Sequence, residues 1–188
     1  MAKSRSTWPN HPQHRSLPLP APSNYCFDTL QEHVGHHFGV TTPILLDQTR
    51  IDGFAQCTGD TQWIHVDVNR ARTHGPFDGT IAHGMLLLSL VPTAHFELGV
   101  YPSDAANVLN YGFDRVRFLA PVPAGTLVQL RVEVTEVTPK TGGFLVRCKN
   151  TAHSIVDPSK PLMVADSLAM VMGATAATAA TAVTAVTA

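Results

Sequence analysis

The chain contains 188 residues with a formal net charge of -1, and only 14% of the residues are charged. This weak charge excludes the basic footprint of a nucleic-acid-binding protein and leaves no polybasic patch for a membrane surface. The 44% of hydrophobic residues suffice for one buried core, and no apolar run approaches the roughly 20 residues that span a bilayer.

Three segments are predicted: a tail of residues 1–23, a folded domain of residues 24–172 and a second tail of residues 173–188. The first tail is rich in Pro, Ser and His, a composition typical of disorder, and it lacks the apolar stretch of a secretory signal. The second tail is an Ala/Thr/Val repeat without charge or turn signals. We expect one domain between them, and the sequence does not indicate a role for either tail.

The cysteines are three in number, widely spaced and without a Cys-x-x-Cys pair: Cys26, Cys57 and Cys148. Such a pattern indicates free thiols in a reducing compartment rather than a disulfide framework. We therefore expect a cytoplasmic protein.

The first part of the domain is predicted to consist of short elements. Residues 27–39 form a short amphipathic helix or turn that ends at Gly39, and the β-branched, apolar residues 40–47 form a strand. Asp47 then caps a helix that runs to Gly59. Apolar residues at positions i, i+3 and i+4 give this helix one buried face: Ile51, Phe54 and Ala55.

A polar, turn-rich stretch follows, with one helical turn predicted over residues 68–72. Residues 84–98 are apolar nearly all round, which predicts a helix that is buried on most sides. Pro92 lies inside this segment and is expected to kink or break the helix, because proline lacks the backbone N–H of an intrahelical hydrogen bond.

The last part is rich in strands, predicted at residues 106–118, 126–137, 143–153 and 161–172. The second of them alternates cleanly between apolar and polar residues, which is typical of a half-buried antiparallel strand. Because four such strands follow a single apolar helix, the order predicts an α+β hotdog fold, an antiparallel sheet wrapped around a central helix. It excludes a doubly wound parallel sheet, in which helices and strands alternate.

Asp60 and His65 stand out between the two helices. An imidazole can give or take a proton at neutral pH, and a carboxylate beside it can orient the ring or hold a water proton. Both are expected on an irregular loop, where the two side chains can share one pocket. On spacing alone, a structural interpretation is favoured: Asp60 caps the next helical turn and His65 is a packed ring.

The sequence around Asp60 and His65 favours the catalytic interpretation instead. The sequence "FAQCTGDTQWIHVD", followed by "HGMLLLS", resembles the MaoC-like (R)-specific enoyl-CoA hydratases and dehydratases, whose signature has the form Gly-Asp-x-Asn-Pro-x-His. A His-Gly-Met/Leu segment opens the central helix in that family. Residues 110–125, "NYGFDRVRFLAPVPAG", resemble the strand and connector after that helix. The resemblance covers about residues 33–172 and is nearest to the NodN-like branch and the bacterial 3-hydroxyacyl-thioester dehydratases.

The resemblance implies reversible syn hydration of a trans-2-enoyl thioester to an (R)-3-hydroxyacyl thioester, without a cofactor or metal. Asp60 and His65 match the acid/base pair that activates one water for attack on C3. Gly84 matches the residue whose backbone N–H stabilises the enolate-like thioester oxygen. The substrate would be an acyl-CoA or an acyl-carrier thioester, and the family implies a homodimer.

Two residues depart from the signature, because Gln62 and Trp63 stand where the family often has Asn-Pro. Gln62 keeps an amide that can orient water or His65, on a longer side chain. Trp63 either narrows the substrate channel or packs, and packing is the interpretation that we favour.

Four further residues are candidates for supporting roles. His83 matches a family position and is expected to orient the loop. Ser89 matches a small hydroxyl residue of the family and bonds either the Asp60 carboxylate or its own helix backbone. Asn110 and Tyr111, on the strand after the helix, either border the acyl channel or are structural.

Two other patterns are weaker indications of function. The strand cations Arg115, Arg117, Arg131 and Arg147 are candidates for phosphate binding, but solvated sheet charges are the commoner case. His33, His36 and His37 share the spacing of one helical face, yet no cysteine or carboxylate ligand accompanies them at zinc-site spacing, so no metal is expected.

Two alternative functions stay open. One is an acyl-CoA thioesterase on the same fold, against which the pairing of Gly59-Asp60 and His65 with His83-Gly84 argues. The other is a non-catalytic acyl-thioester-binding accessory protein, which the Gln62-Trp63 departure supports.

Overall fold

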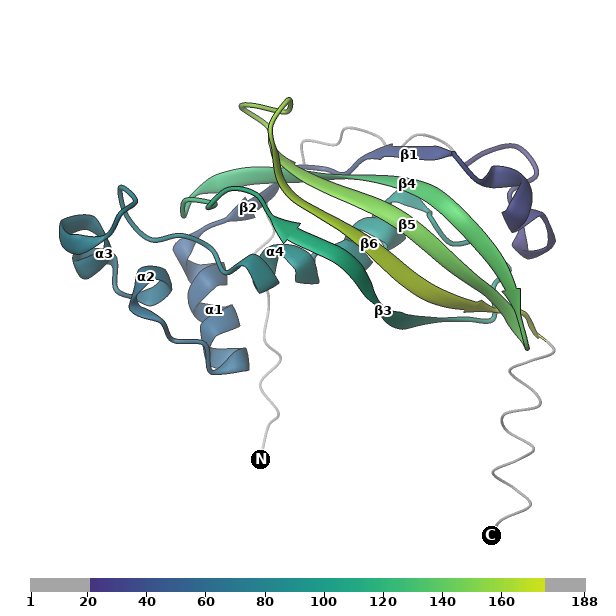
Figure 1. The fold of residues 1–188 in the computed structure, drawn as a ribbon, viewed down its shortest axis with the longest axis horizontal. Coiled ribbons are helices and arrows are strands. Elements are labelled where there is room, and N and C mark those ends of the chain that lie inside the picture. Colours follow the sequence, from purple (N-terminus) through teal and green to yellow (C-terminus); the bar gives the residue numbers. More distant parts are fainter. Residues whose placement is uncertain (1–20, 175–188) are drawn as a thin grey trace, which may run out of the picture.

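The computed structural model describes residues 21–174, so most of both predicted tails lies outside the described residues. A curved antiparallel sheet lies over one central helical segment, and three further helices gather at one end of the molecule (Figure 1). The predicted arrangement of a sheet wrapped around a helix is thereby confirmed. None of the helices within residues 21–174 combines the length and the hydropathy that crossing a bilayer requires.

The sheet is built mainly from the four predicted strands. Its order is β1-β4-β5-β6-β3, where β1 spans His37–Val40, and β2 (Ile44–Leu46) also pairs with β4, so that β3 forms one edge. The four long strands agree with the prediction to within three residues: β3 (Asn107–Phe118), β4 (Thr126–Lys140), β5 (Gly143–Ser154) and β6 (Pro161–Met172).

The alternation in β4 has the predicted consequence for burial. Val128, Leu130, Val132 and Val134 face the core and are almost completely buried. A β-bulge between Val134 and Glu136 then shifts the register against β5. Since a bulge adds one residue to one strand, the next core residue is Val137 instead of the residue that a strict period of two would select.

The central helical segment is divided into α4 (Gly84–Ser89) and α5 (Val91–Leu98), with Leu90 between them. Pro92 lies in the first turn of α5. A proline costs no hydrogen bond there, because the first N–H groups of a helix have no intrahelical partner. The predicted break is therefore confirmed at the residue before Val91.

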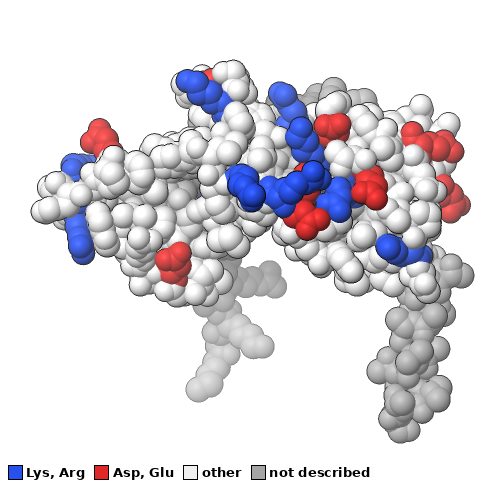
Figure 2. All heavy atoms as spheres, in the orientation of Figure 1, with Lys and Arg blue, Asp and Glu red and all other residues white. Residues whose placement is uncertain are grey.

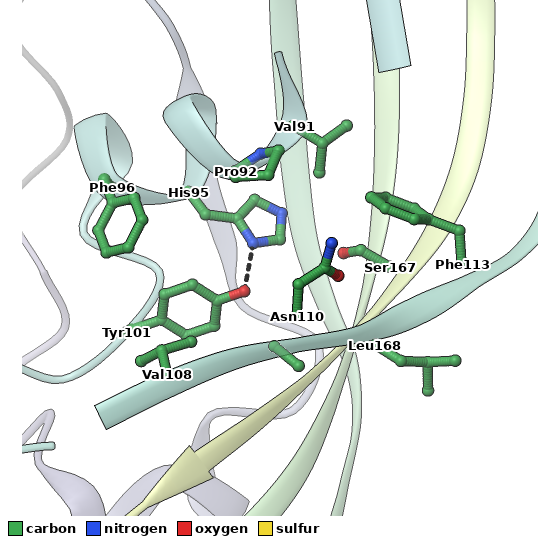
Figure 3. Close-up of a pocket in the computed structure, with 11 residues that line it drawn as sticks. Val91, Pro92, His95, Phe96, Tyr101, Val108, Asn110, Phe113, Ser167 and Leu168 are labelled. Carbon is green, nitrogen blue, oxygen red and sulfur yellow. Dashed lines mark hydrogen bonds between the residues drawn. The ribbon is translucent and has the colours of Figure 1, made fainter. Parts of the chain in front are cut away.

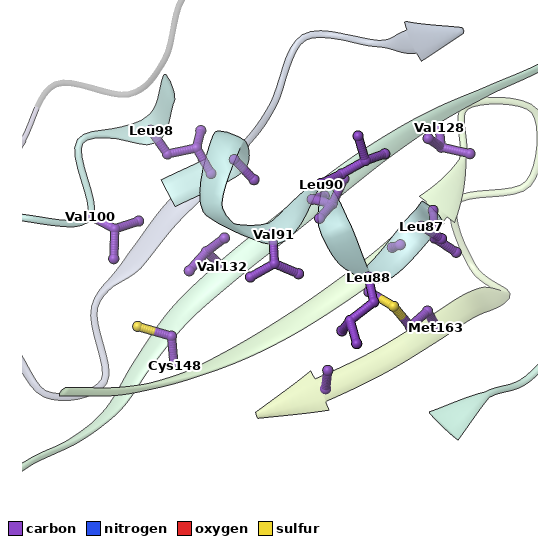
Figure 4. Packing of buried hydrophobic residues seen from close by; sticks show 14 of the residues in the cluster. Leu87, Leu88, Leu90, Val91, Leu98, Val100, Val128, Val132, Cys148 and Met163 are labelled. Atoms are coloured by element: carbon purple, nitrogen blue, oxygen red, sulfur yellow. The ribbon is translucent and has the colours of Figure 1, made fainter. Parts of the chain in front are cut away.

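Both helices bury apolar side chains against the concave face of the sheet. Figure 4 shows the helix residues Leu87, Val91 and Leu98 together with Val132 of β4 and Met163 of β6. Full burial of each such side chain contributes roughly 1.5–3 kcal/mol. This packing fixes the position of the first residues of α4 under the sheet, and these residues border the site described below.

The helix after Asp47 is also confirmed. Helix α1 spans Gln48–Thr58, the Asp47 carboxylate accepts a hydrogen bond from the Arg50 N–H at 2.9 Å, and Gly59 ends the helix with φ of +81°. The two strands before it are shorter than the predicted 40–47 strand: β1 (His37–Val40) and β2 (Ile44–Leu46). Between them Thr41 binds β4 through its side chain, since its hydroxyl accepts from the Leu130 N–H at 3.0 Å.

Three other local predictions need correction. The first helical element is a 3-10 helix, η1 (Phe27–His33), so the expected helix to Gly39 is wrong in its second half, where Gly35 turns the chain into β1. Helix α3 (Val68–His74) is longer than the single turn predicted. A short helix, α2 (Trp63–Val66), replaces the irregular loop that was expected around His65.

Candidate functional site

Three side chains from separate elements converge beside the start of α4: Asp60, His65 and His83. Asp60 follows the left-handed Gly59 that ends α1, His65 lies on α2, and His83 is the residue before α4. One carboxylate oxygen and one nitrogen of each ring lie within 4.8 Å of one another. The predicted Asp60–His65 pair therefore faces a common point, and His83 joins it.

The ring of His65 is held in one tautomer. It is only 7% exposed, and its Nδ1 lies 2.7 Å from the carbonyl oxygen of Ile81. A carbonyl oxygen only accepts, so Nδ1 carries the proton and donates it. Nε2 is therefore the nitrogen with the free lone pair, which is the form that a general base requires.

His83 connects the three parts of the site. Its Nε2–H donates to the backbone carbonyl of Asp60 at 2.9 Å, and its ring stacks on that of His65 with a centroid distance of 3.8 Å. Phe54 of α1 packs against the His83 ring, with 5.1 Å between the two ring centroids. Because the His83 carbonyl also accepts from the Leu87 N–H at 3.3 Å, one buried residue ties the Asp60 turn, the His65 ring and helix α4 together.

A cleft of about 270 Å³ opens beside His65. Gly84 and Leu87 of α4 line one side of the cleft, and Phe118 with the connector after β3 lines the other. A side chain at Gly84 would collide with the Phe118 ring, since an added Cβ would lie 2.9 Å from it. Glycine thus lets the helix backbone and this aromatic wall approach closely. The sequence did not indicate Phe118, because its role depends on that close approach.

The other predicted supporting residues lie differently. Gln62 is exposed at the start of α2, and only its backbone N–H contacts Asp60, at 3.5 Å from the carboxylate. Trp63 packs under the Arg70 guanidinium, which lies 4.4 Å from the centre of the ring, in agreement with the packing interpretation. Ser89 donates to the Leu86 carbonyl at 2.7 Å, which is the backbone alternative. None of these three lines the cleft beside His65.

The two predicted channel residues on β3 lie far along the strand from Phe118. Tyr111 is 70% exposed. Asn110 lines a second, smaller cavity of about 90 Å³ between α5, β3 and β6, together with His95 and Ser167 (Figure 3). Both cavities lie between the central helical segment and β3. Only the first of them is lined by His65, which together with Asp60 forms the pair that we call the dyad.

The second cavity borders a closed hydrogen-bond network. The two hydrogens of the Asn150 amide nitrogen are shared among three nearby acceptors, so the amide oxygen faces His95, which donates from Nε2 at 2.6 Å. His95 Nδ1 then accepts from the Tyr101 hydroxyl at 2.7 Å. Burial lowers the pKa of His95 to about 4, and the bond to Asn150 offsets part of that shift.

Two of the four strand arginines are occupied by acids. Figure 2 shows positive and negative side chains interleaved over this face of the molecule. Arg147 binds Asp114 at 2.8 Å and Glu136 at 3.3 Å, and Arg115 pairs with Asp166. Such pairing favours the interpretation of solvated sheet charges for both residues.

Within residues 21–174, Asp60, His65 and His83 form the single group whose ligand atoms are close enough to hold a metal ion. The His33, His36 and His37 group considered from the sequence does not form one, because η1 ends at His33 and the next two residues of the group lie beyond it. Any cation site would therefore coincide with the dyad.

Comparison with known proteins agrees with the geometry. Residues 29–155 match the family model described as MaoC like domain. The chain is 37% identical to Nodulation protein N of Rhizobium meliloti (strain 1021) over 137 residues, which cover 73% of this chain and 85% of that protein. It is 36% identical to 3-hydroxyacyl-thioester dehydratase Z of Mycobacterium tuberculosis (strain CDC 1551 / Oshkosh) over 135 residues, 71% of this chain and 87% of that one.

Among solved structures, the R-hydratase PhaJ1 of Pseudomonas aeruginosa superimposes with a TM-score of 0.62 at 26% identity, covering 74% of this chain and 82% of that one. The family match spans more than half of the chain, and the curated relatives exceed 30% identity over most of their own length. The fold, the converging dyad and these matches together show that the chain belongs to the MaoC-like dehydratase family.

Proposed function

We propose that the protein catalyses the reversible, (R)-specific hydration of a trans-2-enoyl thioester to a 3-hydroxyacyl thioester. The observation that carries this proposal is the convergence of the Asp60 carboxylate on the His65 ring, which lines a cleft together with Gly84. Relatives that bear the names 3-hydroxyacyl-thioester dehydratase and R-hydratase support the reaction class.

In the proposed mechanism, one water is held between the Asp60 carboxylate and Nε2 of His65. The dyad takes a proton from this water as its oxygen bonds to C3, and the electrons of the double bond move toward the thioester oxygen. The Gly84 N–H, which has no acceptor inside α4, donates to that oxygen. The proton then bonds to C2 from the same face, which gives the syn product; dehydration is the reverse.

His83 is proposed to position the dyad without touching the substrate. Its bond to the Asp60 carbonyl fixes the turn that carries the acid, and its stacking fixes the plane of the base. Gln62, whose side chain is exposed, is proposed to have at most a minor influence on the bound water.

The substrate is proposed to be an acyl-CoA or an acyl-carrier thioester, and the assembly a homodimer in which the two β3 edges pair. Edge strands with exposed apolar residues need a partner, and β3 exposes Leu109 and Tyr111.

The three free cysteines support a reducing, cytoplasmic location.

One assay with crotonyl-CoA separates the possible functions. Loss of the enoyl-thioester absorbance, with a 3-hydroxybutyryl-CoA product of R configuration, is the expected result. Release of free thiol instead would show a thioesterase. Saturable binding without turnover would show an acyl-thioester-binding protein, and either of these results would contradict the proposal.

A further inference from the structure

We propose that Gln48, the first residue of α1, is a positioning residue for His65. Its side chain contacts the backbone of His65 and the segment before α4, and through both contacts it fixes the place and the tautomer of the imidazole. Gln48 does not line the cleft, so it acts through His65 and not on a bound substrate. The effect on the ring stands on these contacts alone, whereas the effect on turnover rests on the function proposed above.

The Gln48 amide uses both of its hydrogens and its oxygen. Nε2 donates to the Asp52 carboxylate at 2.7 Å and to the backbone carbonyl of His65 at 2.8 Å. Oε1 accepts from the Thr80 hydroxyl at 2.6 Å. An ionised carboxylate and a carbonyl only accept, so the amide nitrogen must face them and the oxygen must face Thr80. The side chain is therefore fixed in one orientation.

Helix α2 depends on contacts from outside. It contains only Trp63–Val66, and a single turn of helix is not stable in isolation. The last carbonyl groups of a helix also lack intrahelical partners, and Gln48 supplies a donor for the carbonyl of His65. The position of the His65 backbone therefore depends on a side chain from another helix.

The second contact of Gln48 leads to the acceptor of the His65 ring. Thr80 is buried and directly precedes Ile81, whose carbonyl accepts from His65 Nδ1. The Ile81 N–H donates in turn to the Ile64 carbonyl at 3.1 Å. Gln48 thus holds both sides of the Nδ1–H bond, the ring through the His65 backbone and the acceptor through Thr80. It closes a loop of hydrogen bonds between α1, α2 and the segment before α4.

This loop of hydrogen bonds controls the tautomer of His65. With the proton on Nδ1, Nε2 keeps the lone pair that a general base requires. A neutral imidazole without a fixed partner exchanges between its two tautomers, and the form with a proton on Nε2 cannot take a proton from the reacting water. If Gln48 no longer holds the Ile81 carbonyl against Nδ1, part of the protein should carry the inactive form, and turnover should fall.

Gln48→Met tests the proposal, because methionine is similar in length but has no amide. Gln129→Met is the matched control: the Gln129 amide also donates to a backbone carbonyl, that of Thr41 at 2.7 Å, but this bond joins β4 to the segment between β1 and β2. Nitrogen NMR of the imidazoles reports the tautomer, and the His65 signals are identified by their loss in His65→Gln. We expect the Nδ1–H form in the unmodified protein and in Gln129→Met, and a mixture of tautomers in Gln48→Met.

Turnover of crotonyl-CoA gives the second readout. In Gln48→Met, kcat should fall about tenfold or more, as small misplacements of a catalytic group do, while KM changes much less. In a His65→Gln background the same change should have little further effect, because Gln48 acts through that ring and such effects are not additive. Circular dichroism checks the fold. Should Gln48→Met fail to fold, Thr80→Val, which removes only the hydroxyl that binds Gln48, replaces it with the same expectations.

A folded Gln48→Met variant that keeps the Nδ1–H form of His65 and the normal kcat overturns the proposal. Equal losses in Gln48→Met and Gln129→Met also overturn it, since they would show a general loss of stability. A changed tautomer with an unchanged kcat overturns the kinetic part. If the unmodified chain never hydrates crotonyl-CoA, the proposed function is contradicted, and the NMR comparison alone decides whether Gln48 positions the ring.

Discussion

The two ends of the central helical segment both hold buried histidines, but they treat them in opposite ways. At the start of α4, His65 and His83 each keep one ring nitrogen without a protein partner, beside an exposed carboxylate and an open cleft. In α5, His95 has both nitrogens bonded, to Tyr101 and Asn150, and borders a small cavity.

With the proposed function, this difference separates the reactive site from a structural one. A ring whose two nitrogens are both satisfied gains nothing by exchanging a proton or binding a cation, and burial stabilises its neutral form. A ring with one free lone pair near water can do both. Burial alone therefore does not identify a catalytic histidine, and an unused nitrogen alone does not either, since His33, His36 and His153 also keep one. The proposed site is distinguished by an unused nitrogen that lies beside a carboxylate and an open cleft.

The largest effect on activity is expected from substitutions of Asp60 and His65. Asp60→Asn and His65→Gln should each lower the hydration rate by about 10²–10⁴-fold, because general acid–base groups contribute that much. The measurement is steady-state turnover of crotonyl-CoA, with thermal melts to confirm folding. Near-normal turnover in either folded variant would refute the roles given to Asp60 and His65.

For His95, we expect an effect of pH on the free energy of unfolding instead. The pKa of His95 is lowered to about 4 in the folded protein, whereas an unfolded histidine titrates near its ordinary value of 6.5. Between these two pH values the unfolded chain binds more protons than the native one, so stability falls as the pH drops from about 6.5 to 4. The contribution is roughly 3 kcal/mol.

Denaturant unfolding at several pH values measures this effect, and His95→Phe is the comparison variant. The variant should lose part of the pH dependence while keeping hydration activity. It should also be less stable near pH 7 by about 1–3 kcal/mol, since Asn150 and Tyr101 each lose a buried partner. An unchanged slope would mean that other histidines with lowered pKa values, such as His36 and His153, cause the dependence.

A smaller effect should sharpen the role of the cleft. Gly84→Ala keeps the N–H of residue 84 but places a Cβ 2.9 Å from the Phe118 ring. The ring must move, so kcat/KM for crotonyl-CoA should fall about tenfold, as small misplacements of a substrate do. Combining the change with Phe118→Ala removes the clash and should recover part of the loss; no recovery would contradict the steric explanation.

The smallest effect is expected at Trp63. Its contact with Arg70 is a cation–π interaction worth about 0.5–1 kcal/mol at an exposed site. Trp63→Leu should lower the free energy of unfolding by about that amount and change the turnover by less than the Gly84 variant. A large loss of turnover would instead place the indole in the substrate path.

Local chemistry allowed much of this protein to be predicted from its sequence. The period of two in residues 126–134 defines which face of β4 is buried, and Asp47, Gly59 and Pro92 mark helix ends because their own backbone or side-chain chemistry acts over a few residues. The family motif brought out Asp60, His65 and Gly84, since these positions lie within short stretches.

Tertiary structure decided what those stretches do together. The stacking of His83 on His65, the closeness of Phe118 to Gly84 and the bonding of His95 to Asn150 each join residues that lie 18 or more positions apart. No local pattern encodes such contacts, because they depend on how the sheet, α1 and the central helical segment pack. The same packing determines which nitrogen of each histidine finds a partner, and so distinguishes the rings of the proposed site from the ring of His95.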